Sequence, residues 1–354
     1  MSPQPSPQSL ATDPKHLAIW IQELENDQDR EFLVEGLMYG FKLVDIDPQD
    51  IPKAIAPNHK SALQYKHKVE NRLKEEIEDG NYIKANINDV TLISPLAAIP
   101  KADGDVRLIH DLSYKKTGEF SLNDFAIKEE CHYESLNDVL KQLQPNMYMA
   151  KVDLKWAYRS APLHKDQYPL TGLQWLFEGD KEPTILVDTT FCFGARKSPA
   201  YFNRLTKAIK RMMSRRGYGC NVFLDDFILY ETSASKCADS LRTLIALLRS
   251  LGFRINWKKV TDPCQNIVFL GVDISTTDNK LALDPKKTSQ LTMDISHLLA
   301  KKRISKKQLQ RVAGRLSWAT TVHTWGRAYL ASFFQGIQTL HKGEHKMRIT
   351  PAMQ

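Results

Sequence analysis

Apolar positions recur at helical spacing over the first part of the chain. They predict helices within residues 17–43, and the stretch SALQYKHKVENRLKEEIEDG predicts a charged amphipathic helix that ends at Gly80. No catalytic signature accompanies these helices. The apolar positions in the first region are Leu17, Trp20, Ile21, Phe32, Leu33 and Leu37.

From Val90 the pattern changes to that of β-hairpins. VTLISPLAAIPKADGDVRLIHDL contains two β-type runs around a polar turn, and this arrangement places Lys101 and Arg107 near the tip of a hairpin. A second hairpin is predicted from PLTGLQWLFEGDKEPTILVDTTFCF, with its turn at residues 179–183.

The central region predicts a regular alternation of strands and helices. MYMAKVDL is a short apolar strand that ends at Asp153, and SPAYFNRLTKAIKRMM is a helix with Pro199 in its first turn. VFLDDFILY then predicts a hairpin, SKCADSLRTLIALLRSLG a helix that stops at Gly252, and FRIN a further strand. If the inserted hairpin at 168–193 is set aside, the order is that of a split βαβ sandwich, in which the first strand and the central hairpin are neighbours.

The central hairpin carries two adjacent carboxylates, Asp225 and Asp226, in an otherwise apolar run. One interpretation is a pair of strands, 222–224 and 227–230, joined by a polar Asp-Asp turn. The predicted topology offers another, because it can bring Asp153 beside both acids. Three converging carboxylates repel one another unless hard cations such as Mg²⁺ or Mn²⁺ neutralise them. Two such ions ~3.5–4 Å apart can activate a primer 3′-hydroxyl and hold a leaving pyrophosphate.

Composition is that of a globular protein. A chain of 354 residues predicts two or three subdomains. Its residues are 42% hydrophobic and 25% charged, as in ordinary globular proteins. No apolar run approaches the ~20 residues needed to span a bilayer. We expect residues 1–15 to be a disordered tail, because MSPQPSPQSLATDPKH lacks the apolar core of a signal peptide. An intracellular location is the simplest expectation, with cytoplasm and nucleus unresolved. The five cysteines form no C-x-x-C pair and are expected to be reduced and structural.

A net charge of +8 suits a polyanionic partner. The cations crowd two regions, the helix after Phe193-Gly194 and the C-terminal part, where Ser305 and Gln308 predict a capping box. They serve either solubility or the binding of a nucleic-acid backbone, which would weaken steeply with salt. The cations are Arg204, Lys207, Lys210, Arg211, Arg215 and Arg216, and then Lys286, Lys287, Lys301, Lys302, Arg303, Lys306, Lys307, Arg311 and Arg315.

Several of these segments, in this order and spacing, resemble the motifs of reverse transcriptases. The palm segments are KVDLKWAY, FCFGARKSPAYF, VFLDDFIL, LGFRINWKK and VFLGVDI, and AAIPKADGDVRLIHDLS resembles the fingers motif. The resemblance covers roughly residues 17–335 and looks closest to the DIRS-like retrotransposons that carry a tyrosine recombinase. It implies an α+β fold, a right-hand polymerase with fingers, a split-βαβ (ferredoxin-like) palm and a helical thumb.

The same resemblance implies a division of the chain. After an N-terminal helical region, the fingers comprise two segments, the palm comprises two segments, and a helical thumb or connection follows. The ranges are 16–59 for the helical region, 60–121 and 160–193 for the fingers, 122–159 and 194–275 for the palm, and 276–354 for the thumb.

The resemblance also implies catalytic and metal-binding roles. Asp153, Asp225 and Asp226 match the metal-binding aspartates, and the backbone carbonyl of Leu154 matches a further ligand, for two Mg²⁺ or Mn²⁺ ions. Lys259 matches the lysine that can protonate the departing pyrophosphate. A plain solvent lysine is the alternative, since the adjacent Lys258 leaves the register open.

Other matching positions would bind the nucleotide. Lys101 and Arg107 match the cations that hold the triphosphate. Tyr158 matches the aromatic gate that excludes a 2′-hydroxyl, with an ordinary core tyrosine as the alternative, and Phe193-Gly194 matches the motif beside it.

A last group would hold primer and template. It comprises Ser198, Pro199 and Phe269-Leu270-Gly271, the last of which resembles the hairpin that grips the primer, although the same letters are an ordinary strand end. Two departures from the family stand out: Phe223 replaces a frequent tyrosine, and residues 195–197 read ARK where small residues are common. Arg196 and Lys197 could contact phosphate or template, or mark a drifting copy.

The resulting hypothesis is an RNA-directed DNA polymerase that uses a primed RNA or DNA template and dNTPs. We do not expect it to bind a membrane. Protein partners are not predicted. No carboxylate cluster after residue 285 could supply an RNase H site, since only Asp294 and Glu344 occur there. The alternative is a decayed or repurposed retroelement fragment that binds nucleic acid without polymerising.

Overall fold

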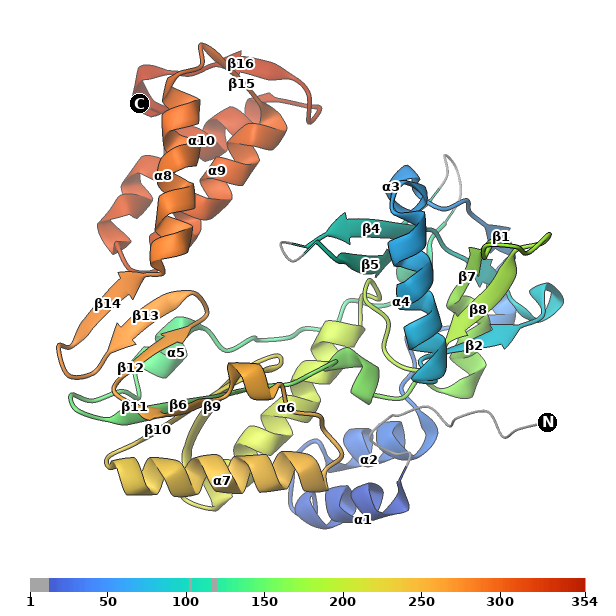
Figure 1. The fold of residues 1–354 in the computed structure, drawn as a ribbon, viewed down its shortest axis with the longest axis horizontal. Coiled ribbons are helices and arrows are strands. Elements are labelled where there is room, and N and C mark those ends of the chain that lie inside the picture. The colour runs from blue at the N-terminus through green and yellow to red at the C-terminus, as the bar shows by residue number, and fades with distance from the viewer. Residues whose placement is uncertain (1–12, 102–103, 116–119, 354) are drawn as a thin grey trace. The chain divides into compact units, whose positions relative to one another are not determined.

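The computed structural model describes residues 13–101, 104–115 and 120–353 (Figure 1). It divides into two compact units. Unit 1 is Met1–Glu134, Val152–Leu229 and Asp239–Val260, and unit 2 is Ser135–Lys151, Tyr230–Ala238 and Thr261–Gln354. Across the described ranges, no helix combines the length and apolarity needed to cross a bilayer.

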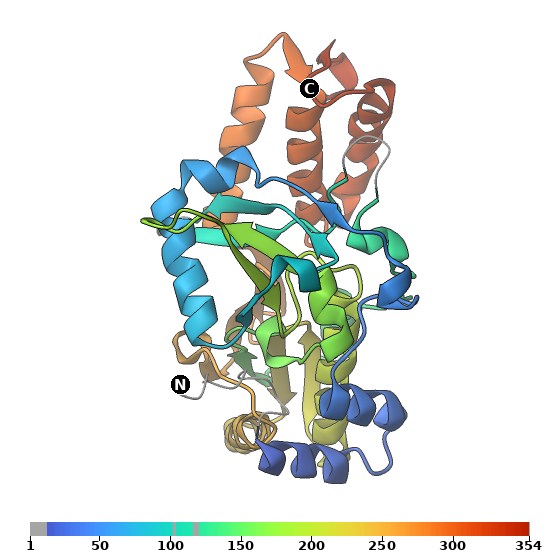
Figure 2. The same ribbon diagram turned by 90° about the vertical axis from the view of Figure 1, so that its right-hand side faces the viewer.

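Unit 1 begins with the two helices that the apolar spacing predicts, α1 (Pro14–Glu23) and α2 (Arg30–Tyr39). The side chain of Asp13 caps α1 by accepting a hydrogen bond from Lys15 N at 2.9 Å. Most of the predicted tail, residues 1–12, lies outside the described residues. Trp20 is fully buried and donates from Nε1 to Leu251 O at 3.0 Å. These helices therefore belong to the folded core of unit 1 (Figure 2).

Both predicted hairpins are confirmed. β4 (Leu96–Pro100) pairs with β5 (Val106–His110), and β7 (Gly172–Trp175) pairs with β8 (Thr184–Asp188). The second hairpin belongs to a sheet of order β1-β3-β7-β8-β2. Its other strands are β1 (Ala54–Ile55), β2 (Tyr82–Ala85) and β3 (Leu92–Ile93).

The pattern predicts one helix over 61–80, and there are two, α3 (Lys60–Gln64) and α4 (Lys66–Glu78), separated at Tyr65. Val69 and Leu73 of α4 are fully buried against Leu96 and Val106 of the first hairpin and Leu173 of the second, so these elements share one core.

The palm region has the predicted split-βαβ topology. The elements follow one another as β6 (Tyr148–Asp153), α6 (Ser198–Arg215), β9 (Gly219–Phe223), β10 (Asp226–Glu231), α7 (Ala234–Ser250) and β11 (Thr261–Cys264). The strand order in the sheet is β11-β6-β10-β9. The first strand therefore neighbours the second strand of the central hairpin, as the topology required.

Two details of the palm prediction are wrong. The central turn consists of Leu224 and Asp225, because Asp226 already begins β10. The fourth strand is β11 and not FRIN, of which only Ile255 forms an isolated bridge, to Leu154. The backbone of FRIN instead forms hydrogen bonds with the end of β6 and the residues after it. Arg254 O accepts from Lys155 N, and Asn256 N donates to Asp153 O.

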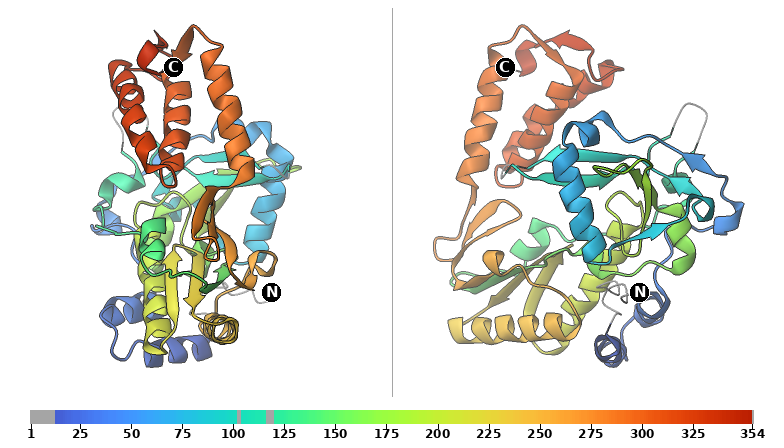
Figure 3. Two further views of the ribbon diagram at one scale, coloured as in Figure 1. Left: turned by 90° about the vertical axis from the view of Figure 1, so that its left-hand side faces the viewer. Right: turned by 45° about the vertical axis from the view of Figure 1, so that its right-hand side comes forward.

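Unit 2 contains the helical C-terminal region that the pattern predicts (Figure 3). Leu298, Leu309, Val312 and Phe333 form its buried core. The predicted capping box is present, with Ser305 Oγ accepting from Gln308 N at 3.3 Å. The elements are α5 (Leu136–Leu140), β12 (Asn266–Phe269), β13 (Val272–Ser275), β14 (Lys280–Leu283), α8 (Pro285–Leu299), β15 (Arg303–Ser305), α9 (Lys306–Ala319), α10 (Arg327–Thr339) and β16 (Lys346–Arg348).

Candidate active site

Asp153 is the last residue of β6 and is buried, with 2% of its surface exposed. Both of its carboxylate oxygens accept hydrogen bonds: Oδ1 from Asn256 Nδ2 at 2.9 Å and Oδ2 from Lys259 Nζ at 2.8 Å. A buried carboxylate needs such partners, since removal from water disfavours its charged form. The sequence singled out Lys259 but not Asn256, for which the only signal was its place in LGFRINWKK.

Lys259 brings the three predicted acids into one electrostatic site. The hydrogen bond to Asp153 raises the pKa of its ammonium, and the negative charges of Asp153, Asp226 and Asp225 raise it further. Lys259 lies in the short helix Trp257–Lys259, and 59% of its side-chain surface is exposed. Asp225 and Asp226 follow Asp153 by 72 and 73 residues in the sequence, yet all three interact electrostatically with the Lys259 ammonium.

The turn that carries Asp225 is fixed by a backbone contact to β6. Leu154 N donates to Asp225 O at 3.0 Å, next to Asp153. Burial raises the pKa of the Asp225 carboxyl, and the charge of Asp153 adds to the increase, while a backbone hydrogen bond and Lys259 oppose it. The ionised form of Asp225 is thus under-compensated in the protein alone.

The donor set fits a hard divalent cation, because its side chains offer oxygen and its negative charge exceeds its positive charge. The predicted carbonyl ligand, Leu154, is part of the same strand end. Within the described part of the chain, however, no group of three or more His, Cys, Asp or Glu side chains is arranged to hold an ion. Each Asp153 oxygen already accepts one hydrogen bond, from Asn256 or from Lys259, and keeps a second lone pair for a cation.

Tyr158 stands beside these acids at the start of a short helix, Tyr158–Ser160. Its ring centroid lies 5.1 Å from that of Phe193 and 5.3 Å from that of the buried Phe202. Burial raises the pKa of its hydroxyl well above the ordinary value, and the charges of Tyr133 and Asp225 add to this. Tyr158 is thus half-buried and interacts electrostatically with Asp225. This position is compatible with a gate that excludes a 2′-hydroxyl and also with an ordinary core tyrosine.

Phe193 and Gly194 follow the fingers insertion, and Phe193 is 42% exposed. Gly194 has a φ of +122°, and a Cβ there would collide with the carbonyl oxygen of His110. A glycine is required at this position because the backbone passes directly against β5.

Lys101 and Arg107 line one cavity of about 210 Å³ together with Trp156, Arg159 and Phe193. Lys101 Nζ is 3.1 Å from Asp105 Oδ2. Residues 102–103 of the hairpin tip lie outside the described residues. The structure therefore gathers three of the predicted nucleotide-binding residues at one cavity.

The predicted primer and template residues lie in different units. Ser198 and Pro199 begin α6 in unit 1, where Ser198 is fully buried and its Oγ has no hydrogen-bond partner among the described residues. Phe269, Leu270 and Gly271 lie in unit 2, at the turn between β12 and β13, and Phe269 is 2% exposed. Leu270 and Gly271 both have positive φ, of 48° and 82°.

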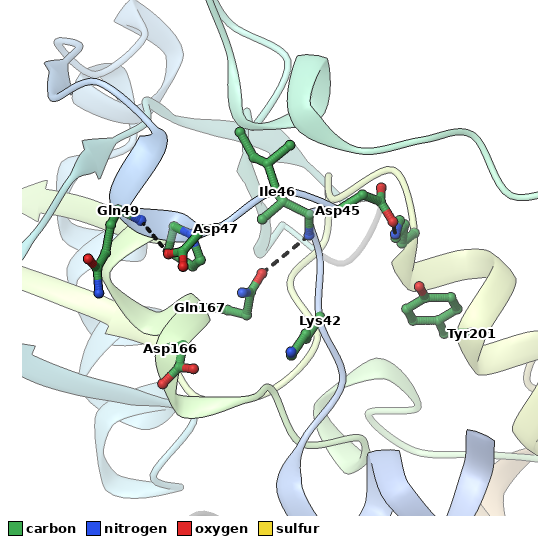
Figure 4. A pocket seen from close by; sticks show the side chains of 11 residues that line it. Lys42, Asp45, Ile46, Asp47, Gln49, Asp166, Gln167 and Tyr201 are labelled. Atoms are coloured by element: carbon green, nitrogen blue, oxygen red, sulfur yellow. Dashed lines mark hydrogen bonds and ion pairs between the residues drawn. The ribbon is translucent and has the colours of Figure 1, made fainter. Parts of the chain in front are cut away.

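The unusual residues Arg196 and Lys197 make internal contacts. Lys197 is 2% exposed and forms an ion pair with Asp45 from the N-terminal region, while its ammonium lies 5.7 Å from the Tyr201 ring centroid. Arg196 donates from its side chain to Ala126 O at 3.0 Å. Asp45, Tyr201 and neighbouring side chains line a cavity of about 810 Å³ (Figure 4). The N-terminal region thus supplies the partner that explains the lysine in ARK.

Comparison with known proteins finds a family model that matches part of the chain. Residues 99–274 match the model described as "Reverse transcriptase (RNA-dependent DNA polymerase)". The chain is similar to the retrovirus-related Pol polyprotein from transposon opus of Drosophila melanogaster, with 25% identity over 67% of this chain and 22% of that polyprotein. It is also similar to Protein P of duck hepatitis B virus (strain Germany/DHBV-3), with 24% identity over 60% and 26% of the two chains. The chain spans about a quarter of the length of these relatives.

Solved structures share the fold. The foamy viral protease-reverse transcriptase in complex with double-stranded DNA superposes with a TM-score of 0.65 and 19% identity, over 88% of this chain and 49% of that chain. The complex with an RNA/DNA hybrid gives 0.65 and 17%, over 96% and 44%. Residues 99–274 therefore match the reverse transcriptase family model, and the chain has the α+β right-hand polymerase fold.

Proposed function

We propose that this chain is an RNA-directed DNA polymerase that adds deoxynucleotides to a primer 3′-hydroxyl. The observation that supports it most directly is the position of Lys259, whose ammonium interacts with Asp153, Asp225 and Asp226 together. An ordinary hairpin turn would not need two acids that share a counter-ion with a third from another strand.

The reaction forms one bond and breaks one. The primer 3′-hydroxyl loses its proton to water as its oxygen attacks the α-phosphorus. A new P–O bond forms, and the bond from that phosphorus to the bridging oxygen breaks so that pyrophosphate leaves. Two Mg²⁺ or Mn²⁺ ions, held by the three aspartates and the carbonyl of Leu154, would supply Lewis acidity. Lys259 has a raised pKa and is protonated at neutral pH, so it can give a proton to the departing oxygen.

The remaining residues orient the substrates. Lys101 and Arg107 bind the triphosphate at the cavity that they share with Phe193, and Tyr158 packs under the incoming sugar. Pro199 and the turn at Leu270 and Gly271 contact template and primer, whereas the neighbouring Ser198 and Phe269 are buried. These roles follow the division into fingers, palm and thumb that the motifs predict, and we place the chain nearest to the DIRS-like retrotransposon type.

Primer extension tests the proposal. The full chain, with an annealed primer, dNTPs and Mg²⁺, should extend the primer on matched RNA and DNA templates, and the ratio of the two rates gives the template preference. Asp225→Asn keeps the size of the side chain and removes its charge, so extension should fall below detection. The matched control is Asp239→Asn, on the exposed face of α7.

Two outcomes would contradict the proposal. Extension by Asp225→Asn at the rate of the unaltered chain would remove Asp225 from the catalytic site. Salt-sensitive duplex binding without any extension, with either metal, would favour a nucleic-acid-binding retroelement fragment instead.

A further inference from the structure

Three charged side chains are buried together in unit 1, outside the predicted set of catalytic and binding residues. His110 is 2% exposed, Arg159 6% and Asp188 0%. They lie at the end of β5, in the short helix Tyr158–Ser160 and at the end of β8. A charge that leaves water is costly unless hydrogen bonds and opposite charge compensate it. Their arrangement shows how each of them is compensated.

Asp188 joins the other two side chains. Its Oδ1 accepts a hydrogen bond from Arg159 Nη1, and its Oδ2 lies 3.0 Å from His110 Nδ1. Arg159 forms a second ion pair, from Nε to Glu76 Oε2 of α4 at 2.9 Å. The network therefore ties β5, β8 and α4 to the short helix that begins at Tyr158.

His110 bridges two hydrogen-bond acceptors. Its Nε2 lies 3.1 Å from Gly172 O, while its Nδ1 contacts the Asp188 carboxylate. A neutral imidazole has a single N–H, so only the imidazolium donates to a carboxylate and a carbonyl at once. With that charge, His110 and Arg159 balance the two negative charges of Glu76 and Asp188. The ring of His110 is thus held from both sides.

Two neutral side chains complete the surroundings of the network. Burial raises the pKa of the Tyr82 hydroxyl and of the Cys192 thiol, and the charge of Asp188 adds to the increase in both. The guanidinium carbon of Arg159 lies 4.8 Å from the Tyr82 ring centroid. Neither residue adds a negative charge. The cations that line the same cavity as His110 are Arg72, Lys101, Arg107 and Arg159.

The network adjoins the ring pair of Tyr158 and Phe193 at two points. Arg159 directly follows Tyr158 in the chain. Gly194 directly follows Phe193, and its backbone passes against the carbonyl oxygen of His110. Loss of either link would allow the 5.1 Å spacing between the two ring centroids to change.

We propose that Arg159, Asp188 and His110 position the Tyr158–Phe193 ring pair and so set how strongly the site discriminates between dNTP and rNTP. They are positioning residues, since they act through the two rings. A gate excludes a 2′-hydroxyl only where its ring is held in the space that the hydroxyl would take, and a small displacement opens that space. The inference rests on the proposed polymerase function and on the gate role of Tyr158.

The test is the ratio of kcat/KM for dNTP to that for rNTP in primer extension by the full chain. An Asn amide takes the place of the His110 Nδ1, and a Gln amide takes that of its Nε2. His110→Asn therefore keeps the hydrogen bond to Asp188, whereas His110→Gln keeps only the one to Gly172 O. We expect the ratio to fall at least about fivefold in His110→Gln and to stay within about twofold of the unaltered chain in His110→Asn.

Two more variants address the partner and the fold. Asp188→Asn removes the charge that holds Arg159 and should lower the ratio to a similar extent. Val69→Ala truncates a fully buried side chain of α4 outside the network, so its melting temperature should fall while the ratio is unchanged. A merely structural role would make the network variants behave like this control.

Ratios that stay within about twofold of the unaltered chain in both His110→Gln and Asp188→Asn would overturn the inference. A loss of kcat/KM that is equal for the two nucleotides would overturn it as well. Extension that still requires Asp225 in such experiments leaves the polymerase proposal standing, so the two failures are distinguishable.

Discussion

Leu224 precedes Asp225, the turn residue predicted to bind metal, and has a φ of 54°. A two-residue hairpin loop needs left-handed backbone, which Asn or Gly supplies more cheaply than Leu. Trp156 also has a positive φ, of 55°, and lies three residues after Asp153. Two strained residues therefore lie close in sequence to the predicted metal-binding aspartates. Stability is given up at these positions, which is common where a site must hold a fixed geometry.

Asp225 illustrates the same conflict between stability and function. Burial raises its carboxyl pKa, with the charge of Asp153 adding to the effect, so the fold favours the protonated form. That preference stabilises the protein below the unfolded pKa of about 3.9 and is lost as pH rises through the folded pKa. Asp225→Asn escapes the loss, and we expect it to melt at a higher temperature than the unaltered chain at pH 7.

The measurement is thermal unfolding against pH with EDTA present, so that no divalent ion compensates the acids. The difference between variant and unaltered chain should disappear below about pH 3.9. A melting temperature that is lower for Asp225→Asn at pH 7 would mean that the ionised carboxylate stabilises the metal-free fold, contrary to its raised pKa.

Tyr158 can be tested for the gate role by nucleotide discrimination. Tyr158→Ala should lower the preference for dNTP over rNTP in kcat/KM at least about tenfold, because space opens for a 2′-hydroxyl. Tyr158→Phe keeps the ring that packs on Phe193 and should keep the preference. If Tyr158 is only a core residue, the Ala variant loses stability and both activities in equal proportion.

At the scale of elements, α6 is held by the N-terminal helices through ion pairs. Arg211 Nη2 donates to Asp27 Oδ1 at 2.6 Å and to Asp29 Oδ2 at 2.9 Å, and Arg204 Nη2 donates to Asp29 Oδ1 at 2.7 Å. Arg216 forms an ion pair with Glu23. The cationic helix predicted from sequence is thus largely neutralised inside unit 1.

Arg211→Ala should destabilise the fold by about 2 kcal/mol at pH 7, since it leaves the buried Asp27 side chain with one partner fewer. Burial alone would raise the pKa of Asp27, but hydrogen bonds from Arg211 and the Asp29 amide, with nearby positive charge, hold it below its ordinary value. The stability that this provides is present above the unfolded pKa and lost as pH falls through the folded one.

Denaturant unfolding at several pH values measures both effects. The cost of Arg211→Ala should shrink as pH falls below the ordinary carboxyl range and Asp27 becomes protonated. Arg242→Ala removes an exposed ion pair of α7 and serves as the control, with a cost within about 0.5 kcal/mol. A similar cost for both variants would show that the α6 pairs contribute no more than surface pairs.

The elements that sequence predicts correctly are those set by local pattern. The order of the palm elements, both fingers hairpins and the Ser305 capping box follow from periodicity and from single start and stop residues. The pairing of Arg211 with Asp27 joins positions 184 residues apart, and that of Lys197 with Asp45 spans 152, so no local signal marks either. FRIN has the alternation of a strand but does not form one, because its backbone partners are in the turn after β6.

At the scale of the whole molecule, positive charge is uncompensated mainly toward the C-terminal end. The sequence contains no Asp or Glu between Asp294 and Glu344, and Asp294 itself pairs with Arg311 and Arg315. In unit 2, a groove of about 730 Å³ is lined by five basic side chains and by one acidic residue, Glu344. The basic side chains are Lys301, Arg303, Lys307, Arg311 and Lys346.

If these cations bind the phosphate backbone of a primed duplex, they set the salt dependence of binding. A plot of log Kd against log salt concentration should be steep, and Lys301→Ala/Lys307→Ala should reduce its slope by about 0.9 for each phosphate that the variant no longer neutralises. Arg242→Ala, on an ion-paired surface of α7, should leave the slope unchanged. Equal slopes for the two variants would assign the groove's cations to solubility and transfer duplex binding to other surfaces of the chain.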